Sequence, residues 1–251
     1  MTDHVPSAAL QGIRFEGVPR DRNRAYIVTA WSGIDEGVTV RREQIPRPGA
    51  HGSFNAPGHL DARVIGMSGH IVAPSPGQLL NMARALTGIL ADGGTATLSI
   101  QGQRSVHTSV GLAAQTAVTV RGNDPRVADF QIQLWAHNPR MFGDVHEFTA
   151  GQVAFHRGNF PATPVIELTG AASGNTVGGP SGKAFTITQG RVAGQTHRID
   201  LATGRVYLNG ALQLGVVSRG DLWTVPSGLP GVTHTLTGSG AMKVILPDTF
   251  V

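Results

Sequence analysis

The sequence predicts a mainly β protein made of two β-sandwich-like domains, with a single α-helix in the N-terminal domain. Gly and Pro supply 34 and 15 of the 251 residues, a content typical of a chain dense in turns. Many short segments alternate apolar and polar residues, the period of a strand with one buried face. Only one segment, at about residues 76–91, has helical spacing. Hydrophobic residues make up 40% of the chain, enough to build real cores.

The N-terminal part is expected to be a series of strands. Its clearest strand runs from Phe130 to Ala136. Here Phe130, Ile132 and Leu134 lie on one side, and the other side carries Gln131, Gln133 and Trp135. Asn138-Pro139 then interrupts the pattern. The strands predicted here are Gly12–Phe15, Ala25–Trp31, Val38–Arg42, Leu60–Val72, Thr95–Gln101, Val106–Leu112, Ala117–Arg121 and Phe130–Ala136.

The segment Gln44–Gly58 interrupts the strands with three prolines and three glycines. Proline cannot donate a hydrogen bond to a sheet, so this segment is predicted to be a loop or an extended arm. A loop of this length inside a compact domain is usually functional or disordered. Because it carries His51 and Phe54, we expect an ordered arm that packs on a neighbouring subunit.

The helix is predicted over Pro76–Ala91. Ser75 can cap it, Pro76 suits its first position, and Gly93-Gly94 is expected to stop it. Its apolar residues follow the i, i+3, i+4, i+7 spacing of one buried stripe: Leu79, Met82, Ala83, Leu86, Ile89 and Leu90. We expect this stripe to pack against a sheet.

After about Asp144 the predicted strands become shorter, and turns follow every 8–12 residues or so, as in a β-sandwich. Ala202-Thr203-Gly204 and Asn209-Gly210 are strong hairpin signals. The domains are predicted to span residues 1–147 and 148–251. The strands expected in the second domain are Glu147–Phe155, Val165–Thr169, Ala184–Thr188, Arg198–Leu201, Arg205–Leu208, Leu222–Val225, Thr233–Thr237 and Met242–Leu246.

Composition excludes several function classes. The chain has no cysteine, which rules out disulfides, thiol nucleophiles and cysteine-bound zinc. No apolar run is long enough for a membrane span, and the first ten residues do not resemble a signal peptide, so we expect a protein assembled in a reducing cytoplasm without membrane insertion. The net charge of +4 is a modest excess of arginine and does not indicate a dedicated nucleic-acid binder.

Motifs for catalysis are missing. The nearest approach to a phosphate-binding loop, around Gly182-Lys183, has Val177 in place of the first glycine and Ala184 in place of the hydroxyl residue. There is no G-x-S-x-G nucleophile elbow. The ten histidines form no H-E-x-x-H pair, and His51, His59 and His70 would meet only through folding. The sequence therefore predicts no enzyme, no cofactor and no metal.

Several motifs follow one another in a recognisable order: Arg41-Arg42 beside the Pro-rich loop, His51-Gly52, Arg63–His70, the helix at Gln78–Leu90, Phe130–Arg140, Phe160–Gly170, Arg198–Gly210 and Leu229–Val232. In this order and spacing the chain resembles the distal tail (Dit-like) minor tail proteins of long-tailed, siphovirus-type bacteriophages. Asn138 stands where the family often has Asp, so any structural contact made by that acid would be made here by the amide.

The resemblance implies an N-terminal domain that forms a homohexameric ring and a galectin-like C-terminal domain. It implies a structural protein of the virion, assembled in the host cytoplasm and located at the tail tip. Its partners would be other copies of itself, the tail tube protein, and a tail-tip or tail-associated hub protein, with receptor-binding proteins or host glycans as further candidates. DNA would only pass through the central channel. Our own expectation places the oligomer interface on the arm, at Arg42, His51 and Phe54.

Two alternatives remain. The C-terminal domain could be a carbohydrate-binding module that contacts the host cell wall, with Tyr207 and Trp223 as exposed aromatic contacts. The chain could also be a tail-associated hydrolase, which would need two facing carboxylates in a cleft. Aromatic residues on short strands are more often core residues, and carboxylates in turns are more often solvated. We therefore rank the scaffold first, glycan binding second and the enzyme third.

Overall fold

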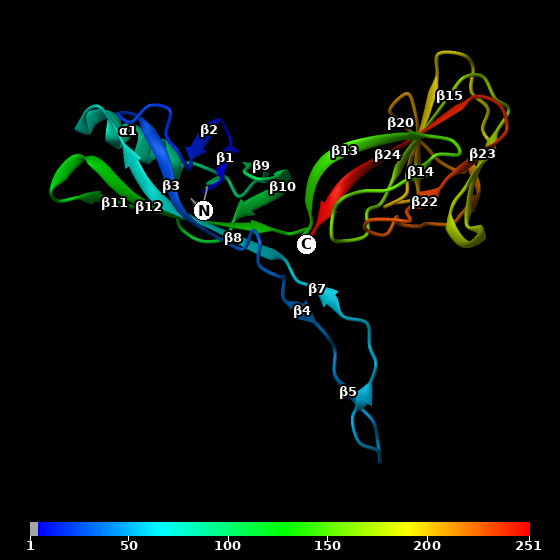
Figure 1. Ribbon diagram of the computed structural model, residues 1–251, viewed down its shortest axis with the longest axis horizontal. Coiled ribbons are helices and arrows are strands. Elements are labelled where there is room, and N and C mark those ends of the chain that lie inside the picture. Colours follow the sequence, from blue (N-terminus) through cyan, green and yellow to red (C-terminus); the bar gives the residue numbers. More distant parts are fainter. Residues whose placement is uncertain (1–4) are drawn as a thin grey trace. The chain divides into compact units, whose positions relative to one another are not determined.

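The computed structural model describes residues 5–251 and divides the chain into two units, one up to Met141 and one over Phe142–Phe250 (Figure 1). The chain is mainly β with one α-helix, which confirms the predicted fold class. The domain boundary predicted at 147/148 falls within strand β13 (Met141–Thr149). Each unit has a hydrophobic core of its own.

In the N-terminal unit the sheet closes on itself. Its strands follow the order β11-β12-β8-β3-β2-β1-β9-β10, and β10 also pairs with β12, opposing Gly111 to Trp135 and Leu112 to Leu134. This pairing closes the sheet into a barrel. The strands are β1 (Ser7–Leu10), β2 (Ile13–Glu16), β3 (Ala25–Ser32), β8 (Arg63–Val72), β9 (Ala96–Gln101), β10 (Ser105–Leu112), β11 (Ala117–Arg121) and β12 (Asp124–Ala136).

Alternation along the two longest strands builds the barrel core. On β8, Ile65, Met67 and Ile71 point inward, and on β12 the inward positions include Phe130 and Ile132. The register of β8 and β12 places Met67 opposite Ile132, so apolar residues of both strands share one face. The residues between these inward positions lie on the outer face of β8 and β12.

Helix α1 (Pro76–Thr87) lies against β8 and β12, and its buried residues Leu79, Met82 and Leu86 join the same core (Figure 1). The cap is as predicted, because Ser75 Oγ accepts a hydrogen bond from the Gln78 amide at 3.3 Å. The helix ends four residues before the predicted end at Ala91. Gly88 closes it, and the following residues turn away before Gly93 is reached.

Strand β1 was not predicted from the sequence. Its four residues pair with both β2 and β9, and Leu10 is fully buried. A strand this short, flanked by the positive-φ residues Gln11 and Gly12, gives too few alternating positions to be recognised from its pattern.

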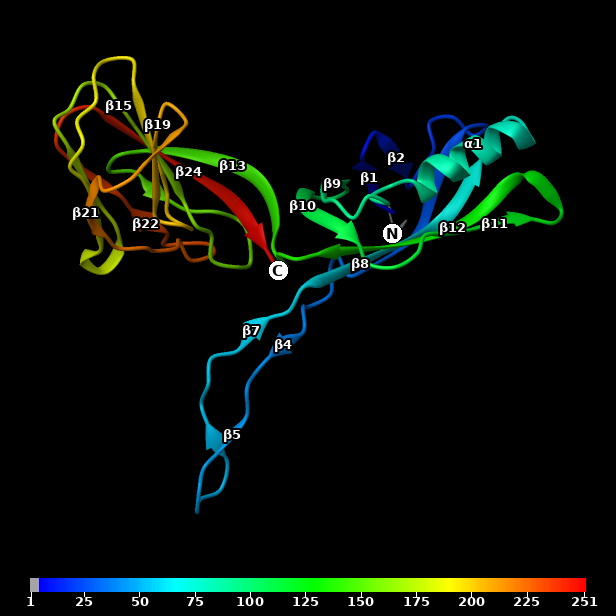
Figure 2. The ribbon, with the colours of Figure 1, turned by 180° about the vertical axis from the view of Figure 1, so that it is seen from behind.

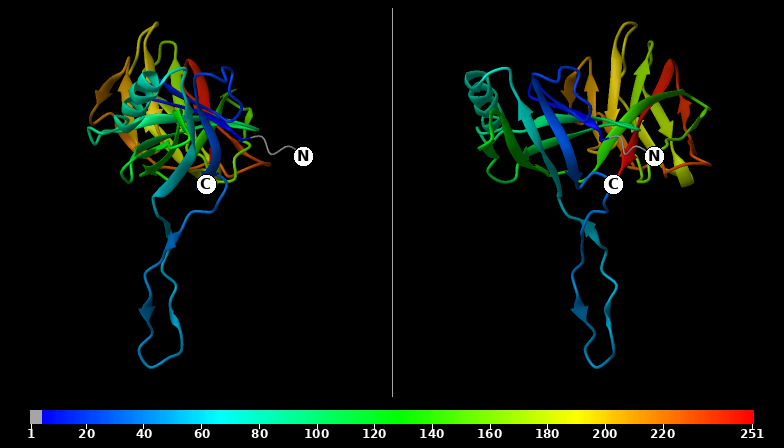
Figure 3. Two further views of the ribbon diagram at one scale, coloured as in Figure 1. Left: turned by 90° about the vertical axis from the view of Figure 1, so that its left-hand side faces the viewer. Right: turned by 60° about the vertical axis from the view of Figure 1, so that its left-hand side comes forward.

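The Pro/Gly-rich segment forms a two-stranded arm that extends from the barrel between β3 and β8 (Figure 3). Near the barrel, β4 (Val40–Arg41) pairs with β7 (His59–Leu60). Further out, β5 (Ile45–Pro46) pairs with β6 (Ser53–Phe54). Of the two predicted forms, a loop or an extended arm, the segment therefore adopts the arm.

The C-terminal unit is a sandwich of two main sheets, ordered β13-β24-β15-β18-β19-β20 and β21-β17-β16-β23, with a small β14-β22 pair (Figure 2). The galectin-like classification stays a prediction. Besides β13 and a 3₁₀ turn at Pro180–Gly182, the elements are β14 (Val153–Ala154), β15 (Val165–Thr169), β16 (Asn175–Gly178), β17 (Ala184–Ile187), β18 (Thr196–Asp200), β19 (Arg205–Leu208), β20 (Ala211–Gln213), β21 (Val217–Gly220), β22 (Val232–Thr233), β23 (Thr235–Thr237) and β24 (Ala241–Phe250).

In the C-terminal unit, one predicted turn is found in the structure and one predicted strand is not. Asn209 and Gly210 both have positive φ in the β19–β20 hairpin, the geometry that this dipeptide predicts. The predicted strand Leu222–Val225 is wrong. Only Val225 makes a bridge there, to Ala162, and the rest of the segment has no strand neighbour. The apolar run is explained by burial of Trp223 and Val225 rather than by sheet pairing.

Candidate functional site: the arm, the outer face and the free sheet edges

The arm exposes apolar side chains along its whole length. Every residue from 41 to 55 is exposed, and Val40, Ile45 and Phe54 are among the exposed large hydrophobic residues. A two-stranded ribbon without a third strand or a covering helix is at best marginally stable in water. An arm of this kind is suited to bury these side chains against another chain.

The predicted interface residues Arg42, His51 and Phe54 all lie on the arm but do not form one cluster. Arg42 Nη1 donates to Asn55 Oδ1 at 3.4 Å, whereas His51 lies in the turn at the tip. Phe54 is 53% exposed, and the guanidinium carbon of Arg47 lies 5.7 Å from its ring centroid. Three separate positions on an extended arm can contact a partner over a long surface, so the interface assignment stays a prediction.

Arg63 fixes the base of the arm. It is 3% exposed, and its Nη1 donates to the carbonyl oxygens of Gly33 at 2.7 Å and Glu36 at 3.1 Å. Its Nε donates to the carbonyl of Pro139 at 3.0 Å. One side chain therefore ties the segment between β3 and the arm, and the segment after β12, to the start of β8. Sequence analysis missed this role. The only signal was an arginine opening a strand directly after the Pro-rich segment.

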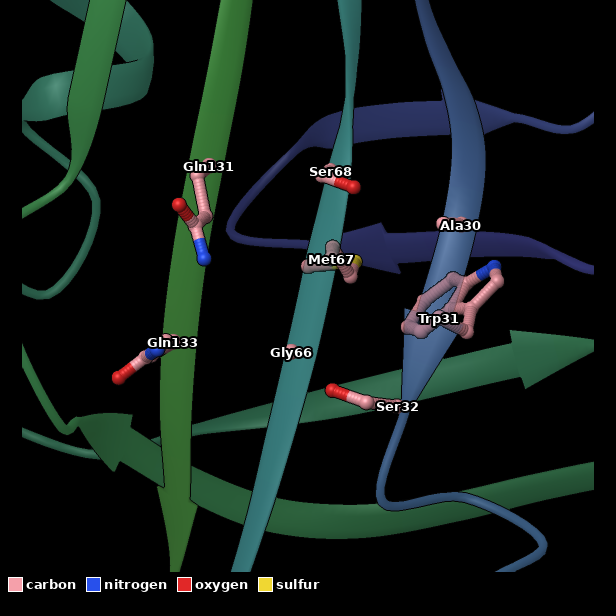
Figure 4. Close-up of a pocket in the computed structure, with 8 residues that line it drawn as sticks. All are labelled: Ala30, Trp31, Ser32, Gly66, Met67, Ser68, Gln131 and Gln133. Carbon is pink, nitrogen blue, oxygen red and sulfur yellow. The ribbon is translucent and has the colours of Figure 1, made fainter.

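Beside the arm base, the outer face of β3, β8 and β12 has a shallow hollow of about 230 Å³ (Figure 4). Its outer side chains are small or polar and uncharged, with Ser32 reaching across Gly66 and the amides of Gln131 and Gln133 on the adjacent strand (Figure 4). A Cβ at position 66 would lie 2.4 Å from Ser32 Oγ, so glycine permits this close approach. Uncharged amides and hydroxyls make a surface that can hydrogen-bond but does not attract phosphate groups strongly.

A charged cluster lies on the same face, at the far end from the arm. Arg121 Nη2 donates to Asp129 Oδ1 at 2.6 Å, and His70 Nδ1 lies 3.1 Å from the same oxygen. These hydrogen bonds, that from Arg121 first, lower the pKa of Asp129. The pKa of Arg121 is raised by the same interaction. The cluster is largely exposed, so it contributes little to stability. It cross-links β8, β11 and β12 and leaves this end of the face close to neutral.

The part of the sheet that bears this face has free backbone edges on both sides. Strand β11 is terminal in the sheet order. On the other side, β3 pairs with β2 at Tyr26 and Ile27, so within residues 5–251 its residues from Val28 to Ser32 have β8 as their one strand neighbour. Unpaired edges offer rows of N–H and C=O groups to another chain. Two different edges on opposite sides permit head-to-tail contacts between copies.

The C-terminal glycan candidates fare differently. Trp223 is only 4% exposed, and its indole Nε1 donates to His234 Nε2 at 3.0 Å in the core, so the expectation of an exposed stacking surface is wrong for this residue. Tyr207 is half-buried on β19, opposite Arg198 and Leu212 on the adjacent strands. The structure does not bring the two aromatic residues together as one sugar platform.

Within residues 5–251, no group of three or more His, Asp or Glu side chains is arranged to hold a metal ion. His51, His59 and His70 are divided among the arm tip, β7 and β8. In the same part of the chain, no helix is both long and apolar enough to cross a membrane.

Comparison with solved structures gives a match over nearly the whole chain. The Dit protein (gp 19.1) of phage SPP1, described as a paradigm of the hub adsorption apparatus in phages infecting Gram-positive bacteria, aligns with a TM-score of 0.76 at 12% identity, covering 98% of this chain and 100% of its own. The two chains therefore share a fold. No family model and no curated protein matches the sequence.

Weaker similarity is found to the baseplate of phage P2 in its activated conformation. The calcium form aligns with a TM-score of 0.49 at 9% identity, and the strontium form with 0.47 at 10%; each covers 96% of this chain and 98% of the other. These scores are too low to establish a common fold.

Proposed function

We propose that this chain is a structural tail protein of a siphovirus-type phage, a hub of the distal tail without enzymatic activity. The observation that carries the proposal is the SPP1 Dit fold over 98% of the chain. Fold alone does not fix function, so the proposal also rests on the surface of this chain. It exposes an apolar arm and two free sheet edges, which are features of a subunit made to assemble.

In this proposal, six N-terminal barrels form a closed ring around a channel for DNA. A closed ring uses two different surfaces of each subunit, repeated by rotation. Each subunit could supply these two surfaces from three places: the free edge of β11, the outer part of β3 and the arm. The uncharged hollow on the adjoining face would let DNA pass without holding its phosphates.

The ring would join the tail tube protein on one side to a tail-tip or tail-associated hub protein on the other. Receptor-binding proteins or host glycans are further candidate partners of the C-terminal unit. The protein would be assembled in the host cytoplasm and would reside in the virion, at the tail tip. The competing carbohydrate-binding function loses one of its two aromatic candidates through the burial of Trp223.

The test is the solution mass of the full chain, measured by light scattering over a dilution series, with negative-stain images of any oligomer. A six-fold ring with a central hole is the expected result. A monomer at every concentration would contradict self-assembly by this chain alone, and the measurement would then be repeated with a tail tube protein present.

Deletion of Pro46–Pro57 tests the arm separately. These residues are exposed apart from the half-buried Ala56, and the inner β4–β7 pair remains. We expect the deletion variant to keep the unfolding midpoint of the wild type and to lose the oligomer. If the variant fails to fold, the arm belongs to the core of its own subunit, and our assignment of it to an interface is wrong.

A further inference from the structure

The segment Asp221–Val225 belongs to the C-terminal sandwich without forming a strand, and it is attached at both ends and between them. Asp221 at its start exchanges hydrogen bonds with Ala184, with the Asp221 amide donating at 3.1 Å and its carboxylate accepting at 2.9 Å. Val225 at its end exchanges backbone hydrogen bonds with Ala162 at 2.8 and 2.9 Å. Between these ties, the Leu222 carbonyl accepts a hydrogen bond from Lys183 Nζ at 2.8 Å, and the side chain of Trp223 is buried in the core.

Trp223 is fixed by a buried histidine. Its indole N–H donates to Nε2 of His234, which is completely buried, and the two ring centroids are 6.0 Å apart. Gly179 lies directly against the indole ring, where a Cβ would come within 2.6 Å of it. The indole is thus held by a hydrogen bond at its nitrogen and by close packing on the Gly179 backbone.

The hydrogen bond defines the protonation state of His234. An indole N–H can only donate, so Nε2 must present its lone pair and the proton must be on Nδ1. A second proton would place two N–H groups against each other at 3.0 Å. Nδ1 faces the Val232 backbone without a well-formed hydrogen bond, so the cation would find little compensation there.

A second buried histidine ties the end of the same segment. His156 is fully buried; its Nδ1 accepts a hydrogen bond from the Gly158 amide at 3.1 Å, and its Nε2 lies 3.3 Å from the Val225 carbonyl. Because Nδ1 accepts, Nε2 is the ring nitrogen that can donate to this carbonyl. The Trp223–Val225 stretch is therefore attached to two buried imidazoles.

We propose that Asp221–Val225 is an acid-sensitive latch of the C-terminal sandwich: protonation of His234 breaks its hydrogen bond to Trp223 and releases the segment from the core. This property is independent of the proposed tail function. It requires only that the released segment and the imidazolium gain access to water.

Nearby charged groups do not offset the cost of protonating His234. The titratable or charged side chains on the neighbouring segments are His156 and Arg157 after β14, Asp221 on the segment itself and Lys183 after the Gly179 turn; β16, β22 and β23 carry none besides His234. Asp221 is bonded to Arg219 and Lys183 to the Leu222 carbonyl. Burial, partly offset by the Val232 backbone, lowers the pKa of His234 to about 4.

The sign of the pH effect follows from this pKa. Above pH 6.5 the imidazole is neutral whether the latch is closed or open, so the closed state has its full stability. As the pH falls from 6.5 towards 4, the open state takes up a proton and the closed state does not, so stability is lost over this window. The opening equilibrium should rise about thirtyfold between pH 8 and pH 5.

Hydrogen exchange of the full chain, analysed by mass spectrometry and corrected for the intrinsic pH dependence of exchange, measures this opening. Peptides covering residues 221–237 should lose protection by about thirtyfold between pH 8 and pH 5, relative to barrel peptides such as 63–72 in the same sample. The matched variant is His234→Gln, whose side-chain oxygen can accept from Trp223 but cannot gain a proton. Its protection should not change in this window. Equal loss in both proteins, or none in the wild type, would overturn the proposal.

A measurement on the wild type covers the case in which His234→Gln does not fold. Ring-¹⁵N-labelled histidine reports the protonation of each imidazole by nuclear magnetic resonance. The His234 signal should remain that of a neutral Nδ1–H tautomer at pH 5.5. A His234 signal that titrates near 6.5 while the segment stays protected would refute the latch.

Discussion

At the scale of single residues, buried polar groups organise both units. Arg63 in the barrel and Arg191 in the sandwich are almost completely buried, and burial lowers the pKa of each guanidinium. Within residues 5–251, neither arginine forms an ion pair with a carboxylate. Arg63 instead donates to backbone carbonyls, which a planar fork of donors can reach in several directions at once.

Replacing Arg63 with Met should lower the free energy of unfolding of the barrel by about 2–4 kcal/mol, because three or more carbonyls lose a charged donor. Arg63→Lys should recover only part of the loss, since one ammonium cannot reach both Gly33 and Pro139. Urea denaturation gives both values. Arg22→Met, at an exposed position between β2 and β3, is the control and should lie within about 0.5 kcal/mol of the wild type.

At the scale of elements, pairing of β3 with β8 depends on a close backbone approach. A Cβ at Gly69 would lie 1.9 Å from the Ile27 carbonyl oxygen and 2.9 Å from Val28 Cα. Neither atom belongs to a flexible side chain, so the strands themselves would have to separate. These two strands also carry the arm, which makes the glycine important for the position of the arm base.

Gly69→Ala should therefore prevent stable folding of the barrel or lower its melting temperature strongly, through loss of the β3–β8 ladder. Gly37→Ala is the matched control, because a Cβ there meets nothing within 4 Å. Circular dichroism melts of the two variants make the comparison. Equal melting temperatures would show that β3 can shift to admit the methyl group.

At the scale of the whole molecule, the proposed assembly depends on surfaces that the single chain leaves uncovered. The free edge of β11 is one of them, and Val120 on this strand is 53% exposed. A lysine on an edge strand opposes edge-to-edge pairing because its charge would be buried in the contact.

Val120→Lys should abolish or weaken the oligomer and leave the monomer as stable as the wild type. Val18→Lys, at a position 67% exposed in the turn after β2, is the control and should assemble normally. Light scattering gives the mass and thermal melts give the stability. Normal ring formation by Val120→Lys would exclude β11 as a subunit contact.

Features governed by short-range periodicity and local backbone preference could be predicted from the amino-acid sequence alone. These are the mainly β class, the capped helix after Ser75, the Asn209-Gly210 hairpin and an arm rather than a central strand at Gln44–Gly58. Each follows from residues within a few positions of one another: alternation, a capping side chain, a positive φ or the missing N–H of proline.

Contacts between residues far apart in the chain could be seen only in the folded protein. Closure of the barrel by β10 and β12, the grip of Arg63 on Pro139 and the burial of Trp223 against His234 join residues 11 to 76 positions apart. The apolar run around Trp223 has the same local pattern whether it forms a strand, a surface or a core segment. Its environment depends on how the two sheets pack around it, and this packing is a property of the whole sandwich rather than of the run.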